Sequence, residues 1–125
     1  MSDCSKYIGM PFKLRSDGKT DGYIDCINLC YRCLETIGID TPPFNVKWYD
    51  TNRWLISRDL LQWGKRITTP KHYDGDIFLF PSCQMAFGCA WNQGVLYINQ
   101  LEQKVAWSVE ERLPKYHCFR SRKLY

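Results

Sequence analysis

The sequence predicts an α+β domain in which N-terminal helices pack on an antiparallel sheet of about five strands. Residues 25–37 repeat apolar side chains at helical spacing, whereas the chain after residue 66 changes to short apolar runs separated by turn residues. Helices followed by a series of strands are typical of the α+β class. A length of 125 residues fits one domain, which we assign to residues 1–125.

The helix over residues 25–37 has the strongest pattern. Asp25 stands where a carboxylate caps free backbone amides, and Gly38 is a typical residue at a helix end. The loop over residues 16–22 is rich in glycine and aspartate, so we expect it to be exposed. One face of the helix carries Cys26, Leu29, Cys30, Cys33, Leu34 and Ile37.

The elements after this helix are shorter. A second helix is predicted over Ser57–Trp63, with Ser57 as its N-cap and Gly64 after its end. The turn residues Asp74–Asp76 introduce the next apolar run, and Asn92–Gly94 is typical of a hairpin turn. Strands are predicted over residues 67–69, 77–80, 86–91, 95–98, 104–109 and 116–120. The basic tail over residues 120–123 is interpreted as a solvated terminus, with contact to phosphate as the weaker alternative.

Composition excludes several classes of protein. Hydrophobic residues make up 45% and charged residues 24%, which is typical of globular domains and excludes disordered and collagen-like chains. No apolar run approaches the roughly 18 residues of a membrane helix, so no membrane association is expected. The net charge of +4 is mild, and a nucleic-acid partner is not expected. The first residues lack the apolar segment of a signal peptide, which predicts a protein that is cytoplasmic when made and that either stays there or leaves by lysis or within a particle.

The seven cysteines are predicted to be thiols. An odd number without a leader argues against a disulfide framework. Cys26, Cys30 and Cys33 have the spacing of a helix face and lack a fourth zinc ligand, so we expect Cys30 and Cys33 to be buried and no metal to be bound. No cofactor is expected either.

Cys26 is the candidate nucleophile. It falls in the first turn of the predicted helix, where backbone amides and the helix dipole lower the pKa of a thiol. The alternative interpretation is a small buried hydrophobic residue. Trp48, Tyr49 and Trp54 follow in an aromatic segment, and they either stack on a ligand in a groove or close the core.

Four segments together resemble the NlpC-type papain-like cell-wall cysteine peptidases. They are Gly9-Met-Pro-Phe12, Tyr23-Ile-Asp-Cys-Ile-Asn-Leu29, Gly38-Ile-Asp40 and Asp74-Gly-Asp-Ile-Phe-Leu-Phe80. The resemblance implies a helix packed on an antiparallel sheet, with Cys26 as nucleophile at the helix start and a histidine on a facing strand. It also implies cleavage of peptidoglycan stem peptides, typically at the γ-D-glutamyl to diaminopimelate bond.

The chain departs from this family at the residues that matter for catalysis. Ala86 stands at the position of the family's histidine. Asn99, or Gln100 with a small register shift, could fill the position of the third polar residue. Asn28 replaces the motif glycine, and Phe12 replaces the motif tyrosine.

Two hypotheses of function remain open at this point. In the first, the domain is non-catalytic and serves as a structural or assembly component, such as a phage tail or baseplate protein within a virion. In the second, it is an active or engineered-inactive peptidoglycan endopeptidase, with Cys26 as nucleophile and a stem peptide as substrate. His72 and His117 are the chain's two histidines and hence the candidates for a substitute base.

Overall fold

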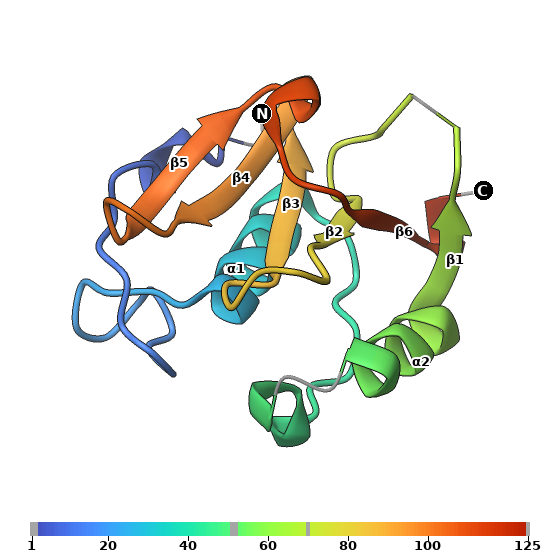
Figure 1. The fold of residues 1–125 in the computed structure, drawn as a ribbon, viewed down its shortest axis with the longest axis horizontal. Coiled ribbons are helices and arrows are strands. Elements are labelled where there is room, and N and C mark those ends of the chain that lie inside the picture. Colours follow the sequence, from blue (N-terminus) through green and yellow to red (C-terminus); the bar gives the residue numbers. More distant parts are fainter. Residues whose placement is uncertain (1–2, 51–52, 70, 125) are drawn as a thin grey trace.

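The computed structural model describes residues 3–50, 53–69 and 71–124, and it has the α+β architecture that the sequence predicts (Figure 1). Short 3-10 helices lie at Ser5–Tyr7, Val46–Asp50, Glu110–Arg112 and Arg122–Leu124. The longer elements are, in chain order, α1 (Cys26–Ile37), α2 (Arg53–Trp63), β1 (Gly64–Ile67), β2 (Ile77–Leu79), β3 (Phe87–Trp91), β4 (Gly94–Asn99), β5 (Lys104–Ser108) and β6 (His117–Ser121).

The strands form a single six-stranded sheet with the order β1-β6-β2-β3-β4-β5. Every neighbouring pair is antiparallel, as predicted. The expected strand at residues 67–69 is displaced, because β1 starts directly after α2 at Gly64. A Cβ atom at Gly64 would lie 2.0 Å from the carbonyl oxygen of Arg120, so this glycine permits the close pairing of β1 with β6 rather than only ending the helix.

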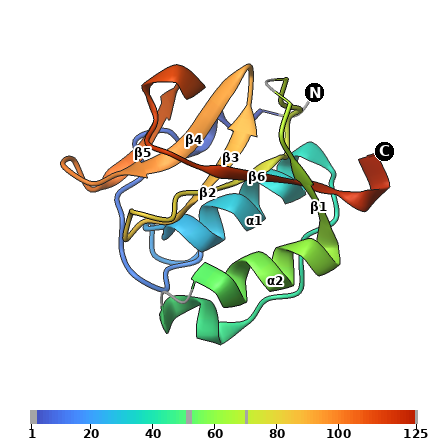
Figure 2. The same ribbon diagram turned by 45° about the vertical axis from the view of Figure 1, so that its right-hand side comes forward.

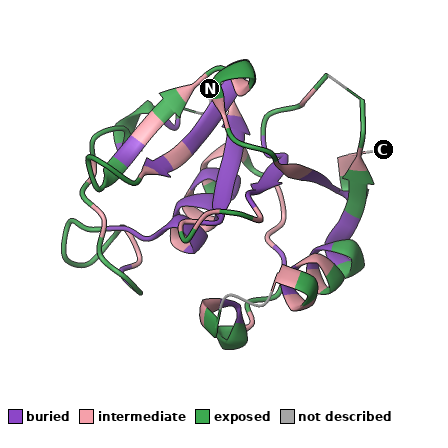
Figure 3. Cartoon of the chain, in the orientation of Figure 1, coloured by how far each residue is buried: buried purple, intermediate pink, exposed green. Residues whose placement is uncertain are grey.

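The two helices cover one side of the sheet (Figure 2). We call this side the helix face and the opposite side the open face. The main core lies on the helix face, where residues of α1, α2 and the five strands β2 to β6 are buried together. A second apolar cluster on the open face is built from Phe78, Phe80, Ala90, Val95 and Cys118, and the segment after β5 packs on it through Leu113 and Tyr116. Figure 3 shows that the central strands are buried along most of their length.

Helix α1 follows its predicted pattern closely. The side chain of Asp25 accepts a hydrogen bond of 2.8 Å from the backbone amide of Asn28, which is the N-cap arrangement. Gly38 ends the helix in the left-handed conformation, with φ of 94°. Cys30 and Cys33 are buried against the sheet, as the spacing predicts, and all seven cysteines are free thiols.

Helix α2 is longer than predicted. It begins at Arg53, so Ser57 lies inside the helix and is not its N-cap; residues 51–52 lie outside the described part of the chain. Ile56, Leu60 and Trp63 are its buried residues, and their spacing sets the face that packs on the core. The predicted helix start was wrong because the apolar face that packs on the core, and not a serine cap, determines the extent of α2.

The interpretation of the C-terminal segment as a solvated tail was also wrong at its first residue. Arg120 is buried in β6, which lies between β1 and β2, and its guanidinium pairs with the buried carboxylate of Asp76. Pairing with two neighbouring strands places the segment inside the sheet. No helix in the described ranges combines the length and apolar character that crossing a bilayer requires.

Candidate functional site

Cys26 and Ala86 line the same cavity, which has a volume of about 410 Å³. Cys26 is the first residue of α1, and Ala86 directly precedes β3, the strand on which α1 packs. Phe12, Trp48 and Phe87 contribute apolar walls. The fold therefore brings the candidate nucleophile and the position of the expected histidine to one site.

The Cys26 thiol is not activated in this setting. The residue is only 9% exposed, and burial raises the pKa of its thiol to about 11. Asp25 adds to the increase, while the backbone amides of Phe87 and Ala86 oppose it without reversing it. The expectation that the helix start lowers the pKa of Cys26 was wrong, because desolvation of the thiolate outweighs the amides and the helix dipole.

Asp25 next to the thiol cannot serve as its base. One carboxylate oxygen accepts hydrogen bonds from the backbone amide and the side-chain amide of Asn28, at 2.8 and 3.0 Å. The other accepts from the backbone amide of Arg15 at 2.9 Å and from the hydroxyl of Tyr49. With four donors satisfied, this carboxylate holds the preceding loop, α1 and the aromatic segment together.

Neither histidine lines the Cys26 cavity. His72 packs on Phe78 of the open face, with ring centroids 4.9 Å apart. His117 opens β6, where its Nδ1 lies 2.6 Å from Nη2 of Arg66. Burial, with Arg66 and Lys115, lowers the pKa of His117. Both imidazoles thus have partners other than Cys26.

Asn99 and Gln100 do not reach the cavity either. They lie at the end of β4 and line a different hollow, together with Phe80 and other residues of the open face. The Asn99 side chain accepts hydrogen bonds from the backbone amides of Leu101 and Glu102, at 2.9 and 3.0 Å. Asn99 therefore stabilises the turn between β4 and β5 rather than orienting a catalytic group.

Polar groups that sequence reasoning did not select also line the cavity. Arg53 donates from Nη2 to the carbonyl of Cys83, while its buried Nε has no hydrogen-bond partner among the described residues. Gln84 and Gln103 add amide groups to the wall. The sequence carries no signal for these three residues, because two of them lie in turns and Arg53 resembles any charged residue of a helix.

Two of the three aromatic residues that the sequence singled out lie at the cavity, and Trp54 does not. Trp48 is buried and stacks on Phe87, with ring centroids 5.5 Å apart, and its Nε1 donates to Asp59 at 2.8 Å. Tyr49 lines the cavity beside it. Trp54 is 70% exposed and is not part of the cavity wall. Trp48 thus closes the core and forms the floor of a hollow.

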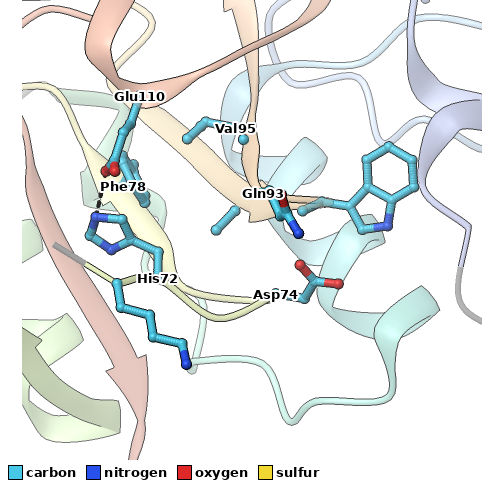
Figure 4. Close-up of a pocket in the computed structure, with 10 residues that line it drawn as sticks. His72, Asp74, Phe78, Gln93, Val95 and Glu110 are labelled. Carbon is cyan, nitrogen blue, oxygen red and sulfur yellow. Dashed lines mark ion pairs between the residues drawn. The ribbon is translucent and has the colours of Figure 1, made fainter.

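A second chemically distinctive cluster lies on the open face. The Nδ1 atom of His72 is 3.4 Å from the Sγ of Cys118 and 3.9 Å from Oδ2 of Asp76. Its Nε2 is 2.6 Å from Oε2 of Glu110, a contact visible in Figure 4. Burial raises the pKa of Cys118, and Asp76 raises it further. Sequence reasoning missed this cluster because its thiol and imidazole are 46 residues apart.

A comparison with models of known protein families finds no match, and neither does a search of curated proteins. Function is therefore inferred from the geometry and chemistry of the Cys26 cavity and of the cluster around His72.

Proposed function

We propose that the chain is a non-catalytic relative of the NlpC-type peptidases and that its Cys26 cavity binds a peptide. In this proposal the chain acts as a structural or assembly component, such as a phage tail or baseplate protein. One observation carries this proposal: the cavity holds a thiol at the nucleophile position and a methyl group, that of Ala86, where the family has an imidazole. The resemblance of the segments around Cys26 and Asp74 supports the relationship to that family.

The missing imidazole deprives the cavity of two chemical steps. A thiol with a pKa of about 11 is thiolate in only about one molecule in a thousand at pH 8, so little nucleophile is present. A leaving amine also needs a proton from a positioned acid, and the neighbouring Asp25 is occupied by four hydrogen bonds. Loss of one member of a nucleophile–base pair costs roughly four orders of magnitude or more in rate.

The cavity retains groups suited to binding a peptide. Phe12, Trp48 and Phe87 offer apolar surface. The guanidinium of Arg53, whose Nε has no hydrogen-bond partner among the described residues, lines the cavity and can donate to a carbonyl or carboxylate oxygen. The side chains of Gln84 and Gln103 can both donate and accept hydrogen bonds. A peptidoglycan stem peptide has this chemistry, and so does an extended segment of a tail or baseplate protein.

Calorimetric titration of a synthetic stem peptide into the purified protein tests the binding step. We expect saturable binding that Arg53→Gln weakens at least fivefold, because the guanidinium in the cavity wall is lost. Arg58→Gln is the matched control, since Arg58 lies on the same helix but its guanidinium pairs with Asp59 on the surface. Absence of binding, or equal affinity in both variants, would contradict a stem-peptide site in this cavity.

The assembly role has its own test. Mass spectrometry of purified phage particles that carry the gene should detect the chain in stoichiometric amounts relative to tail or baseplate proteins. Its absence from the particles would exclude the virion setting without bearing on the peptide-binding cavity.

A further inference from the structure

We propose that His72, Asp76 and Cys118 form a binding site for a divalent metal ion such as Zn²⁺ or Co²⁺ on the open face of the sheet. This inference is independent of the Cys26 cavity, which lies on the helix face. Within the described residues, these three side chains form the one group whose His, Cys, Asp or Glu ligand atoms converge, all within 4.8 Å of one another.

The spacing of the three ligand atoms matches a tetrahedral metal. With Zn–S near 2.3 Å and Zn–N and Zn–O near 2.0–2.1 Å, ligand atoms around tetrahedral zinc lie roughly 3.4–3.6 Å apart. Here Sγ of Cys118 lies 3.4 Å from Nδ1 of His72 and 3.7 Å from Oδ2 of Asp76, and the third edge is 3.9 Å. An ion could therefore enter with shifts of a few tenths of an ångström.

His72 is oriented as a metal ligand. Its Nε2 faces the carboxylate of Glu110 at 2.6 Å, and Glu110 is held in turn by the hydroxyl of Tyr116 at 2.8 Å. Because an ionised carboxylate only accepts hydrogen bonds, Nε2 is the ring nitrogen that donates to Glu110, and Nδ1 is the ring nitrogen that faces Cys118 and Asp76. A carboxylate on the far nitrogen of a histidine is the usual support of a metal-bound imidazole. Figure 4 shows Glu110 reaching His72 from the segment after β5.

Asp76 is held rigidly but is also shared. Arg120 donates to Oδ1 from Nε at 2.9 Å and to Oδ2 from Nη2 at 2.8 Å, and the backbone amide of Tyr73 donates to Oδ2 at 3.0 Å. A metal ion on Oδ2 would compete with one of these donors. The positive charge of a divalent ion and Arg120 is nevertheless balanced. Three negative charges face it, those of the Asp76 carboxylate, the Glu110 carboxylate and a Cys118 thiolate.

The ligand set and its surroundings indicate the kind of metal. A thiolate, an imidazole and a carboxylate suit zinc and related transition metals, whereas calcium and magnesium prefer oxygen ligands alone. His72 and Cys118 line an open cavity of about 400 Å³, which gives an ion a route of entry. No fourth His, Cys, Asp or Glu among the described residues joins the group, so water would complete the tetrahedron.

Cobalt substitution provides a direct test. The full chain is freed of metal with a chelator and titrated with Zn²⁺ by calorimetry and with Co²⁺ by absorption spectroscopy. We expect one equivalent to bind, with a thiolate-to-cobalt charge-transfer band. Cys118→Ser should remove the band and lower the affinity at least tenfold, and Glu110→Gln should lower the affinity about 10- to 100-fold.

Matched controls distinguish this site from other thiols and histidines. Two variants, Cys83→Ser and His117→Gln, each change a residue outside the cluster. Both should bind Zn²⁺ and Co²⁺ with the affinity of the unmodified protein. The proposal is overturned if the unmodified protein shows no charge-transfer band. It is also overturned if Cys30→Ser, which changes a thiol on α1, removes the band. If Cys118→Ser does not fold, the Glu110→Gln variant decides the question. An affinity of this variant for Co²⁺ equal to that of the unmodified protein contradicts the proposal.

Discussion

The two faces of the sheet separate the groups that a cysteine hydrolase would combine. On the helix face, Cys26 occupies the start of α1 beside Ala86, with no imidazole in its cavity. On the open face, His72 has both a thiol and a carboxylate within contact distance, 3.4 Å to Cys118 and 2.6 Å to Glu110. The helix pattern and the motif resemblance identified Cys26 from the sequence, whereas the role of Cys118 is found only from the geometry.

The difference between the two thiols teaches that position in a helix does not by itself create a nucleophile. Cys26 lies at the N-terminus of α1, near the backbone amides of Ala86 and Phe87, yet burial raises the pKa of its thiol to about 11. Cys118 lies in a strand and is more buried still, yet it contacts an imidazole and a carboxylate. The reactivity of each thiol depends on the polar side chains that contact it. The sequence motif around Cys26 contains no such side chain for its thiol.

The largest expected effect lies on the open face. Arg120→Gln should lower the free energy of unfolding by about 3–5 kcal/mol, because it leaves the buried carboxylate of Asp76 without its cation. Chemical denaturation monitored by circular dichroism measures this loss. Lys123→Gln, which removes an exposed charge three residues later, should change the stability by less than about 0.5 kcal/mol. Similar losses in both variants would show that the Asp76–Arg120 pair does not support this face.

An intermediate effect is expected from titration of Cys26. A pKa raised from 9.0 to about 11 means that the folded protein retains the thiol proton more tightly than the unfolded chain. The resulting stability is fully present below about pH 9 and is lost as the pH rises towards about 11, amounting to about 2–3 kcal/mol. Cys26→Ser, which does not titrate here, should therefore lose less stability over this interval. Parallel pH profiles of the two proteins would mean that the Cys26 thiol is solvated.

The smallest expected effect tests how the helix start is held. Asp25→Asn keeps an oxygen that can cap the amide of Asn28 but removes an acceptor for Arg15 or Tyr49. We expect a loss of about 1 kcal/mol in the free energy of unfolding, measured by urea denaturation. Glu35→Gln, an exposed change on the same helix, serves as control and should be nearly neutral. A neutral Asp25→Asn would show that the two additional donors do not depend on the charge.

Local signals in the sequence predicted the parts of the fold that depend on neighbouring residues. The N-cap Asp25, the left-handed Gly38 and the apolar face of α1 all follow from preferences within one helix. The hairpin turn before Gly94 was predicted in the same way, and Asn92 and Gln93 adopt positive φ there. Cys26 was selected from its place at the helix start and from the resemblance, and Ala86 was selected from the resemblance alone; the fold places both in one cavity.

Features that depend on distant residues could not be predicted. The placement of β6 between β1 and β2 buries Arg120, which the sequence presents as part of a basic tail. The same placement brings Cys118 to His72, and no spacing in the sequence announces that contact. The loss of activation at Cys26 depends on burial by the surrounding elements, which outweighs the local effect of the helix start.

Release of cleaved stem peptides, followed by mass spectrometry, tests most directly the claim that the Cys26 cavity is non-catalytic because Ala86 stands where an imidazole is needed. The unmodified protein should leave peptidoglycan fragments uncleaved above background. Ala86→His should gain weak γ-D-glutamyl endopeptidase activity, and Cys26→Ala in that variant should abolish the gain, with His117→Gln as a control that leaves it unchanged. Robust cleavage by the unmodified protein that disappears in Cys26→Ala would contradict the account.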